Sequence, residues 1–372
     1  MAEQTAEREA PPPPPSAPRR RRLALPERIP VRGTILVILS IAIVLGVVIG
    51  TASTLRTGRF TGANWIDLVI NGVARGSVYA LIAMGYTLVY GILFMINFAH
   101  GEVFMAGAFT ALFAAFALEE HGVLNSNPIL SIGILFLVSM VTSMTVALLL
   151  ERVAYRPLRG APRLVPLITA IGASLFLQYT FRGLYSAQAR AYPRINIMEG
   201  SWTMFGAAVA RAQVVVILGA LALMIGLYLF IARTRTGRSM RAVGEDKEIA
   251  SLMGINVDRT IVTTFAIGGL LAGAAGILYV FLFNQVIFTM GFFAGIKAFT
   301  AAVLGGIGSI AGAAIGGVLL GVFEAVGPIL FLTGAGIDSP NQLQPVVAFG
   351  ILVLVLIFRP GGILGAPEEK RA

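Results

Sequence analysis

Four ionisable side chains lie in or beside long apolar stretches of the sequence: His100, Glu102, Lys297 and Glu324. A charge in an apolar medium is costly, so such residues normally face a cavity or pair with one another. We expect Lys297 and Glu324 to pair, with direct contact to a transported solute as the alternative. His100 and Glu102 follow Asn97 at a predicted helix break. We interpret this group as a capped turn, with a gate in a pathway as the alternative.

The sequence contains no arrangement typical of an enzyme. It has no cysteine and only two histidines, His100 and His121, which excludes thiol chemistry, disulfides and cysteine-bound metals. It also lacks the G-x-x-x-x-G-K-[ST] loop that holds nucleotide phosphates. We therefore expect no catalytic residue, no metal site and no cofactor on this chain.

The segments that must position these side chains are mostly apolar. Of the 372 residues, 57% are hydrophobic and 12% are charged, and the mean hydropathy is +0.85. Soluble domains contain about 25% charged residues, so the composition predicts an all-α polytopic membrane protein. The basic residues do not lie on a soluble domain with stacking aromatics, which argues against a nucleic-acid partner.

Ten segments are apolar enough to be transmembrane helices, with eight or nine crossings as alternatives. They are 33–55, 68–96, 102–118, 130–150, 164–182, 212–232, 260–284, 292–308, 312–332 and 344–358. A full crossing needs about 20 residues. The segments 102–118 and 292–308 are short, and we expect either to be a broken or re-entrant helix.

The N-terminal region differs from the rest of the chain. Residues 1–32 form a polar tail with a proline run and four consecutive arginines, for which we predict a disordered cytoplasmic segment. The arginines are interpreted as a topology signal, with binding to anionic lipid or to a proline-motif partner as the alternative. The segment 33–55 is then an extra N-terminal helix ahead of a transmembrane domain at 66–366.

Basic residues are concentrated in the loops 151–163 and 233–259 and near both ends of the chain. The positive-inside rule places these segments, and therefore both termini, in the cytoplasm. An even number of crossings is consistent with this orientation. The loop 183–211 also carries arginines and is the exception to the pattern.

The loop 233–259 contains a predicted amphipathic helix near 245–254. Its assigned residues are Glu245, Asp246, Glu248, Ile249, Ala250, Leu252, Met253 and Gly254. The acids suit the positive end of a helix dipole, the apolar positions share one face, and the glycine is a typical helix stop. A short cytoplasmic helix of this kind is suited to docking into a groove on a soluble partner.

Glycines recur at helical spacing in three of the later segments. They are Gly269, Gly273, Gly308, Gly312, Gly316, Gly317 and Gly321. Small residues at this spacing form a smooth face on which another helix packs closely. We interpret them as static packing positions, with a sliding interface beside a pathway as the alternative.

Several motifs are long enough to compare with known families. They are 76–87 (GSVYALIAMGYT), 95–102 (MINFAHGE), 151–157 (ERVAYRP), 252–257 (LMGINV) and 295–309 (GIKAFTAAVLGGIGS). Together they resemble the LivH-type permeases of ATP-binding-cassette (ABC) importers for branched-chain amino acids. The segment 248–254 resembles the EAA-xxx-G coupling motif of importer permeases. The resemblance extends over 66–366, and the N-terminal extension departs from the family pattern.

This resemblance implies a permease that moves leucine, isoleucine and valine across the inner membrane. Such a chain would pair with a homologous second permease, two cytoplasmic ATPase subunits that bind the ATP, and a periplasmic substrate-binding protein, all in contact with membrane lipid. An ABC permease for urea, short amides or other amino acids is the alternative within this class. A stand-alone secondary transporter is the alternative outside it.

Overall fold

The computed structural model describes residues 31–162, 164–204, 206–337, 339–359 and 361–365. Contacts divide the chain into two units, Met1–Leu45 and Gly46–Ala372. The described part of the first unit is the beginning of helix α1 (Val31–Arg56). The predicted disordered tail lies, up to residue 30, outside the described residues. All later elements belong to the second unit.

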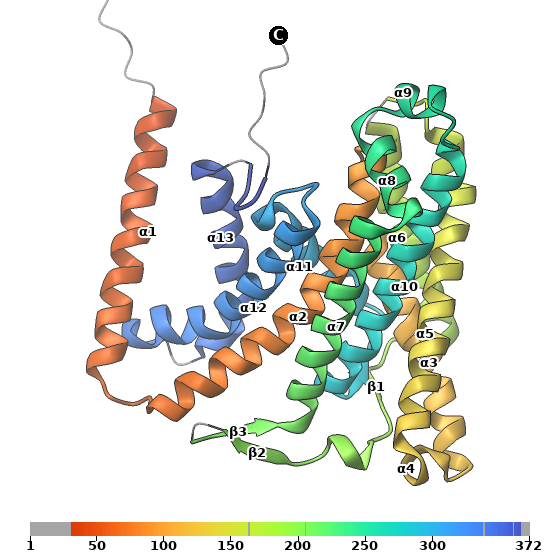
Figure 1. Ribbon diagram of the computed structural model, residues 1–372. Coiled ribbons are helices and arrows are strands. Elements are labelled where there is room, and N and C mark those ends of the chain that lie inside the picture. The colour runs from red at the N-terminus through yellow and green to blue at the C-terminus, as the bar shows by residue number, and fades with distance from the viewer. Residues whose placement is uncertain (1–30, 163, 205, 338, 360, 366–372) are drawn as a thin grey trace, which may run out of the picture. The chain divides into compact units, whose positions relative to one another are not determined.

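The second unit consists of helices joined by short connections and two small β-pairs (Figure 1). Its helices are α2 (Gly62–Leu93), α3 (His100–Glu120), α4 (Val123–Ser126), α5 (Pro128–Leu150), α6 (Leu164–Tyr185), α7 (Arg211–Arg233), α8 (Arg235–Glu245), α9 (Lys247–Leu252), α10 (Val257–Phe283), α11 (Met290–Gly305), α12 (Ile310–Leu332) and α13 (Gln344–Phe358). The π-helical turn η1 (Glu151–Tyr155) and the 3₁₀ turn η2 (Arg156–Leu158) extend α5; further 3₁₀ turns are η3 (Asn196–Met198), η4 (Thr333–Ala335) and η5 (Pro340–Leu343).

Eight helices in the described part of the chain are long and apolar enough to cross a membrane. One is α3, whose 21 residues correct the expectation that 102–118 is short. By contrast, α11 has 16 residues, or about 24 Å at 1.5 Å per residue, which is less than the roughly 30 Å of hydrocarbon. Helix α1 forms over the predicted segment 33–55, and its crossing stays a prediction.

Helix α2 lies at the centre of the second unit, and its backbone closely approaches that of α12. A Cβ atom added to Gly321 would lie 2.3 Å from Gly76 Cα, and one added to Gly317 would lie 2.3 Å from Ala80 Cα. Real Cβ atoms do not approach other atoms this closely, so only glycine permits this contact. The glycines at 317 and 321 are therefore packing positions, as the sequence predicts.

The other predicted glycine positions divide between two further contacts and one turn. Gly269 and Gly273 lie against the backbone of α5, where Ser139 Oγ also donates to the Gly273 carbonyl at 2.7 Å. Gly312 and Gly316 face α11. The assignment of Gly308 to the same face is wrong, because this residue precedes α12, has a φ of +97° and has no neighbour that a Cβ would meet.

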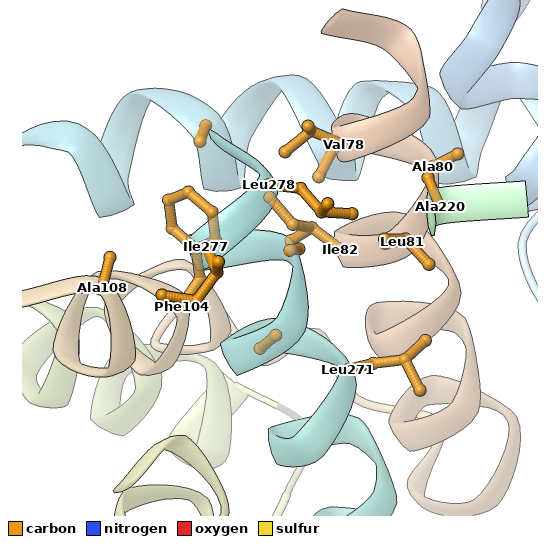
Figure 2. Packing of buried hydrophobic residues seen from close by; sticks show 14 of the residues in the cluster. Val78, Ala80, Leu81, Ile82, Phe104, Ala108, Ala220, Leu271, Ile277 and Leu278 are labelled. Atoms are coloured by element: carbon orange, nitrogen blue, oxygen red, sulfur yellow. The ribbon is translucent and has the colours of Figure 1, made fainter. Parts of the chain in front are cut away.

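Large apolar side chains fill the spaces around these glycine contacts. Figure 2 shows side chains of α2, α3 and α10 converging, among them Leu81, Ile82, Phe104 and Ile277, which are fully buried. Ala220 of α7 belongs to the same cluster. A buried Leu or Ile side chain contributes about 1.5–3 kcal/mol where water is the alternative. In a bilayer the gain comes from close packing instead.

Two β-pairs lie in or beside the 186–210 connection, which belongs to the predicted loop 183–211. Strands β2 (Ser201–Met204) and β3 (Ala207–Ala210) form an antiparallel hairpin. Strand β1 (Arg190–Ala191) pairs with β4 (Gln285–Val286) after α10. The second pairing ties this connection to the end of α10, although the two are distant in sequence.

We predict that Gly321→Ala destabilises the protein by about 1–3 kcal/mol, because the new methyl group must push α2 and α12 apart. Gly226→Ala in α7 is the matched control, since a Cβ there would meet nothing within 4 Å. Thermal unfolding of both purified variants in detergent measures the difference. Equal unfolding temperatures for the two variants would contradict the close α2–α12 contact.

Candidate functional site

The predicted cytoplasmic helix is a compact turn that is capped at both ends. The Asp246 carboxylate accepts hydrogen bonds from the backbone N–H groups of Glu248 (2.8 Å) and Ile249 (2.9 Å), which is a typical N-cap. Gly254, at φ +83°, closes α9 with two backbone bonds, Gly254 N to Ser251 O and Ile255 N to Ala250 O. This pattern is a Schellman C-cap. We call residues 246–254 the coupling turn.

The boundaries of the coupling turn differ from the sequence prediction in one respect. Glu245 is the last residue of α8 and does not open α9. The sequence predicts a single helix near 245–254 because its acids suit the positive N-terminal end of a helix dipole. The extended backbone of Asp246, with φ −152° and ψ 119°, separates two helices instead.

The coupling turn presents apolar side chains outward. Ile249, Leu252 and Met253 are 60%, 86% and 78% exposed. They extend from a short helix in a connection that also carries charged residues, and the described chain leaves most of their surface uncovered. Ala250, on the opposite side of the turn, is buried.

Ala250 anchors the coupling turn to the helices below it. It belongs to an apolar cluster with Val89 of α2, Val243 of α8 and Phe265 of α10. Helix α8 also touches the end of α2 closely, since a Cβ on Gly244 would lie 2.7 Å from the Gly91 carbonyl oxygen. The coupling turn therefore packs against α8 and α10, and α8 packs against α2.

A charged network that the sequence does not predict lies beside the coupling turn. The Arg159 guanidinium donates to the carboxylates of Glu151 and Asp258, and Arg156 lies 3.5 Å from Asp258. This network joins the end of α5 to the start of α10. The available signal in the sequence was an acid, Glu151, directly after the apolar segment 130–150; the structure buries this side chain. Lys247 lies nearby, and partial burial together with Arg159 lowers its pKa.

Asn97 has a structural contact in this region. It is buried, and its Oδ1 accepts a hydrogen bond from the Tyr155 hydroxyl at 2.5 Å. Tyr155 in turn packs against Phe265. The bond ties the connection before α3 to the end of α5. The Tyr155 hydroxyl therefore supplies a hydrogen-bond partner for the buried Asn97 side chain, and no bound solute is needed to explain its position.

His100 and Glu102 are buried at the start of α3. Glu102 Oε1 accepts from Ser174 of α6 at 3.2 Å, and the His100 ring meets the Tyr86 ring edge-on with centroids 4.9 Å apart. His100 Nε2, Glu102 Oε2 and the Tyr86 hydroxyl have no hydrogen-bond partner among the described residues. The structure thus places this pair in a packed polar cluster.

Lys297 of α11 and Glu324 of α12 form an ion pair. Lys297 Nζ lies 2.5 Å from Glu324 Oε1 and donates to the Tyr79 hydroxyl of α2 at 3.3 Å. The Glu324 side chain is 2% exposed and that of Lys297 is 19% exposed. Glu324 Oε2 is buried and has no partner in the described chain. Three helices therefore meet at this pair.

Tyr79 belongs to a row of polar residues along α2, which we call the α2 stripe. Its members, Asn71, Arg75, Tyr79, Tyr86 and Tyr90, are spaced by four, four, seven and four positions, which places them on one side of the helix. At one end, Asn71 and Arg75 line a cavity of about 600 Å³. At the other end, Tyr90 lines a cavity of about 620 Å³ that also touches α8. Tyr79 and Tyr86 are buried between them.

Comparisons with known proteins match this arrangement to one family. The model for the branched-chain amino acid transport system permease component matches residues 68–356. The chain belongs to this permease family. It is 46% identical to the high-affinity branched-chain amino acid transport system permease protein BraD of Pseudomonas aeruginosa, over 83% of this chain and 98% of that protein.

Two further relatives extend the same finding. The LivH permease proteins of high-affinity branched-chain amino acid transport systems in Salmonella typhimurium and Escherichia coli are each 42% identical to this permease, over 82% of this chain and 97% of theirs. The family match includes the coupling turn, the α2 stripe and the ion pair, and it leaves out α1. With its apolar helices, this permease is a multi-pass membrane protein.

We predict that Lys297→Ala and Glu324→Ala each lower the stability of the permease, because each leaves a charge unpaired in an apolar site. The double variant should lose less than the two losses added together. The expected coupling energy is about 0.5–3 kcal/mol. The measurement is thermal unfolding of the unaltered permease, the two single variants and the double variant. Strictly additive losses of stability would show that the two charges contribute no interaction energy.

Proposed function

We propose that this chain is the substrate-translocating permease subunit of an ABC importer for leucine, isoleucine and valine in the inner membrane. The observation that carries the proposal is the 46% identity to BraD across almost the whole of that protein. The permease fold supplies what translocation needs. It has a central helix with a polar side, a cavity at each end and a closed middle.

The energy for transport comes from partner subunits. The chain has no phosphate-binding loop, so two cytoplasmic ATPase subunits bind and hydrolyse the ATP. Exposed apolar side chains at Ile249, Leu252 and Met253 support a docking role for the coupling turn. The complete importer also contains a homologous second permease and a periplasmic substrate-binding protein, which delivers the amino acid.

The coupling turn transmits the ATPase motion to the pathway. When ATP closes the ATPase pair, the groove that holds Leu252 and Met253 moves. Because Ala250 and α8 contact α2 and α10, the motion becomes a rigid-body shift of those helices. The shift switches access to the α2 stripe from one side of the membrane to the other.

The orientation follows from the position of the basic loops. The coupling turn, the charged network around Arg159 and both termini are cytoplasmic in this proposal. The hairpin of β2 and β3 is then periplasmic.

Ser251→Cys and Ser201→Cys test the orientation, because the chain has no cysteine of its own and both serines are exposed. We predict that an impermeant maleimide labels the cysteine at 201 in intact cells and labels the one at 251 only after the membrane is opened. Labelling of the Ser251→Cys variant from outside would show that the true orientation is the reverse of the proposed one. The unaltered chain serves as the unlabelled control.

Leu252→Asp tests the coupling role, because a carboxylate cannot be buried in an apolar groove without a partner. We predict normal membrane insertion, binding of the ATPase subunits weakened by about tenfold or more, and loss of leucine uptake by reconstituted vesicles. Leu252→Met is the matched control and should retain both.

Gly254→Leu should act in the same direction as Leu252→Asp, because a leucine at φ +83° is strained and reshapes the turn. Wild-type ATPase copurification and wild-type uptake in both altered proteins would show that the turn is only a connector. If the unaltered importer takes up no leucine, isoleucine or valine, the substrate assignment is wrong whatever the variants do.

A further inference from the structure

The ion pair between Lys297 and Glu324 carries two features that helix packing does not require. Glu324 Oε2 is buried and has no partner in the described chain, although a carboxylate oxygen normally accepts at least one hydrogen bond. Lys297, by contrast, keeps part of its side chain exposed. The pair is therefore incomplete on the acidic side and accessible on the basic side.

The surroundings of the pair combine a polar and an apolar wall. The polar wall is Tyr79, whose hydroxyl accepts from Lys297. Tyr79 follows Arg75, at the wall of the 600 Å³ cavity, by one turn of α2, or about 6 Å along the axis. The apolar wall that we assign to the site is Phe293, which is 61% exposed and precedes Lys297 by four positions, so that the two share one side of α11.

A free amino acid carries the charges that complement this arrangement. We propose that the zwitterionic amino acid exchanges partners with the ion pair, so that Lys297 binds its α-carboxylate and Glu324 Oε2 accepts from its α-ammonium group. One internal ion pair is then replaced by two to the solute, and no net charge enters the membrane. The aliphatic side chain packs on Phe293. This inference rests on the proposed function, since it assigns the intramembrane site for the same substrate.

The exchange also explains which side chains the site accepts. A lysine, arginine, aspartate or glutamate solute would bring a third charge, for which the site has no partner, and an unpaired charge in the membrane is costly. An uncharged aliphatic side chain brings none. The ion pair thus selects for the shared amino acid backbone, and the apolar wall selects for the side chain.

Exchanging the two charges separates this role from a structural one. The double variant Lys297→Glu with Glu324→Lys retains an ion pair, and we expect it to assemble with the ATPase subunits and to unfold near the unaltered temperature. Its uptake of leucine should fall at least tenfold, because the zwitterion then meets each charge in the wrong position. Uptake at the unaltered rate would overturn the inference and leave the pair as packing.

A second measurement covers the case in which the exchanged variant does not assemble. Phe293→Cys introduces a single thiol beside the site, and Phe292→Cys places one on another side of α11, where a phenylalanine is also exposed. In the energised importer with its binding protein, saturating leucine should slow labelling at 293 at least threefold and leave labelling at 292 unchanged. Equal rates with and without leucine at both positions would overturn the inference. Absence of leucine uptake by the unaltered importer would instead reject the proposed function.

Discussion

The backbone contact between α2 and α12 is the constraint on which the other contacts depend. Gly76 and Gly321 meet with no side chain between them, so α12 cannot move away from α2 without opening a gap that nothing fills. The same contact brings Glu324 of α12 within reach of Tyr79 on α2, by way of Lys297. At its far end, α2 touches α8 through Gly91 and Gly244. One helix therefore links the coupling turn to the ion pair.

This construction favours transmission by rigid segments. The coupling turn is capped at both ends, and Ala250 packs it against α8 and α10. On the other side, Arg159 ties the end of α5 to the start of α10. Packed helices with few internal voids shift between discrete arrangements more readily than they deform. The cavities at the two ends of α2 are separated by the buried side chains of Tyr79 and Tyr86.

The sequence predicts most of the helices because hydrocarbon thickness sets their length, and it predicts the coupling turn because capping residues act locally. It also predicts the partnership of Lys297 and Glu324, since buried charges require partners. It does not predict Arg159 as a link, because its partners are eight and 99 residues away. Gly308 was misassigned because spacing alone does not distinguish a helix face from a turn with positive φ. Likewise, the β1–β4 pairing depends on where α10 ends in space.

The ion pair between α11 and α12 requires an explanation, because two charges are costly to bury. Two apolar side chains of similar size would pack there without the desolvation cost of two charges, and such replacements in other proteins are often neutral or stabilising. Stability is therefore a weak explanation for the presence of this ion pair. What an apolar pair does not provide is two opposite charges at a fixed separation beside an apolar wall. Glu102, whose second oxygen is also unpartnered but which has no cation within ion-pairing distance in the described chain, lacks that complementarity. The pair of Lys297 and Glu324 therefore carries the two opposite charges that a zwitterion requires, and Glu102 does not.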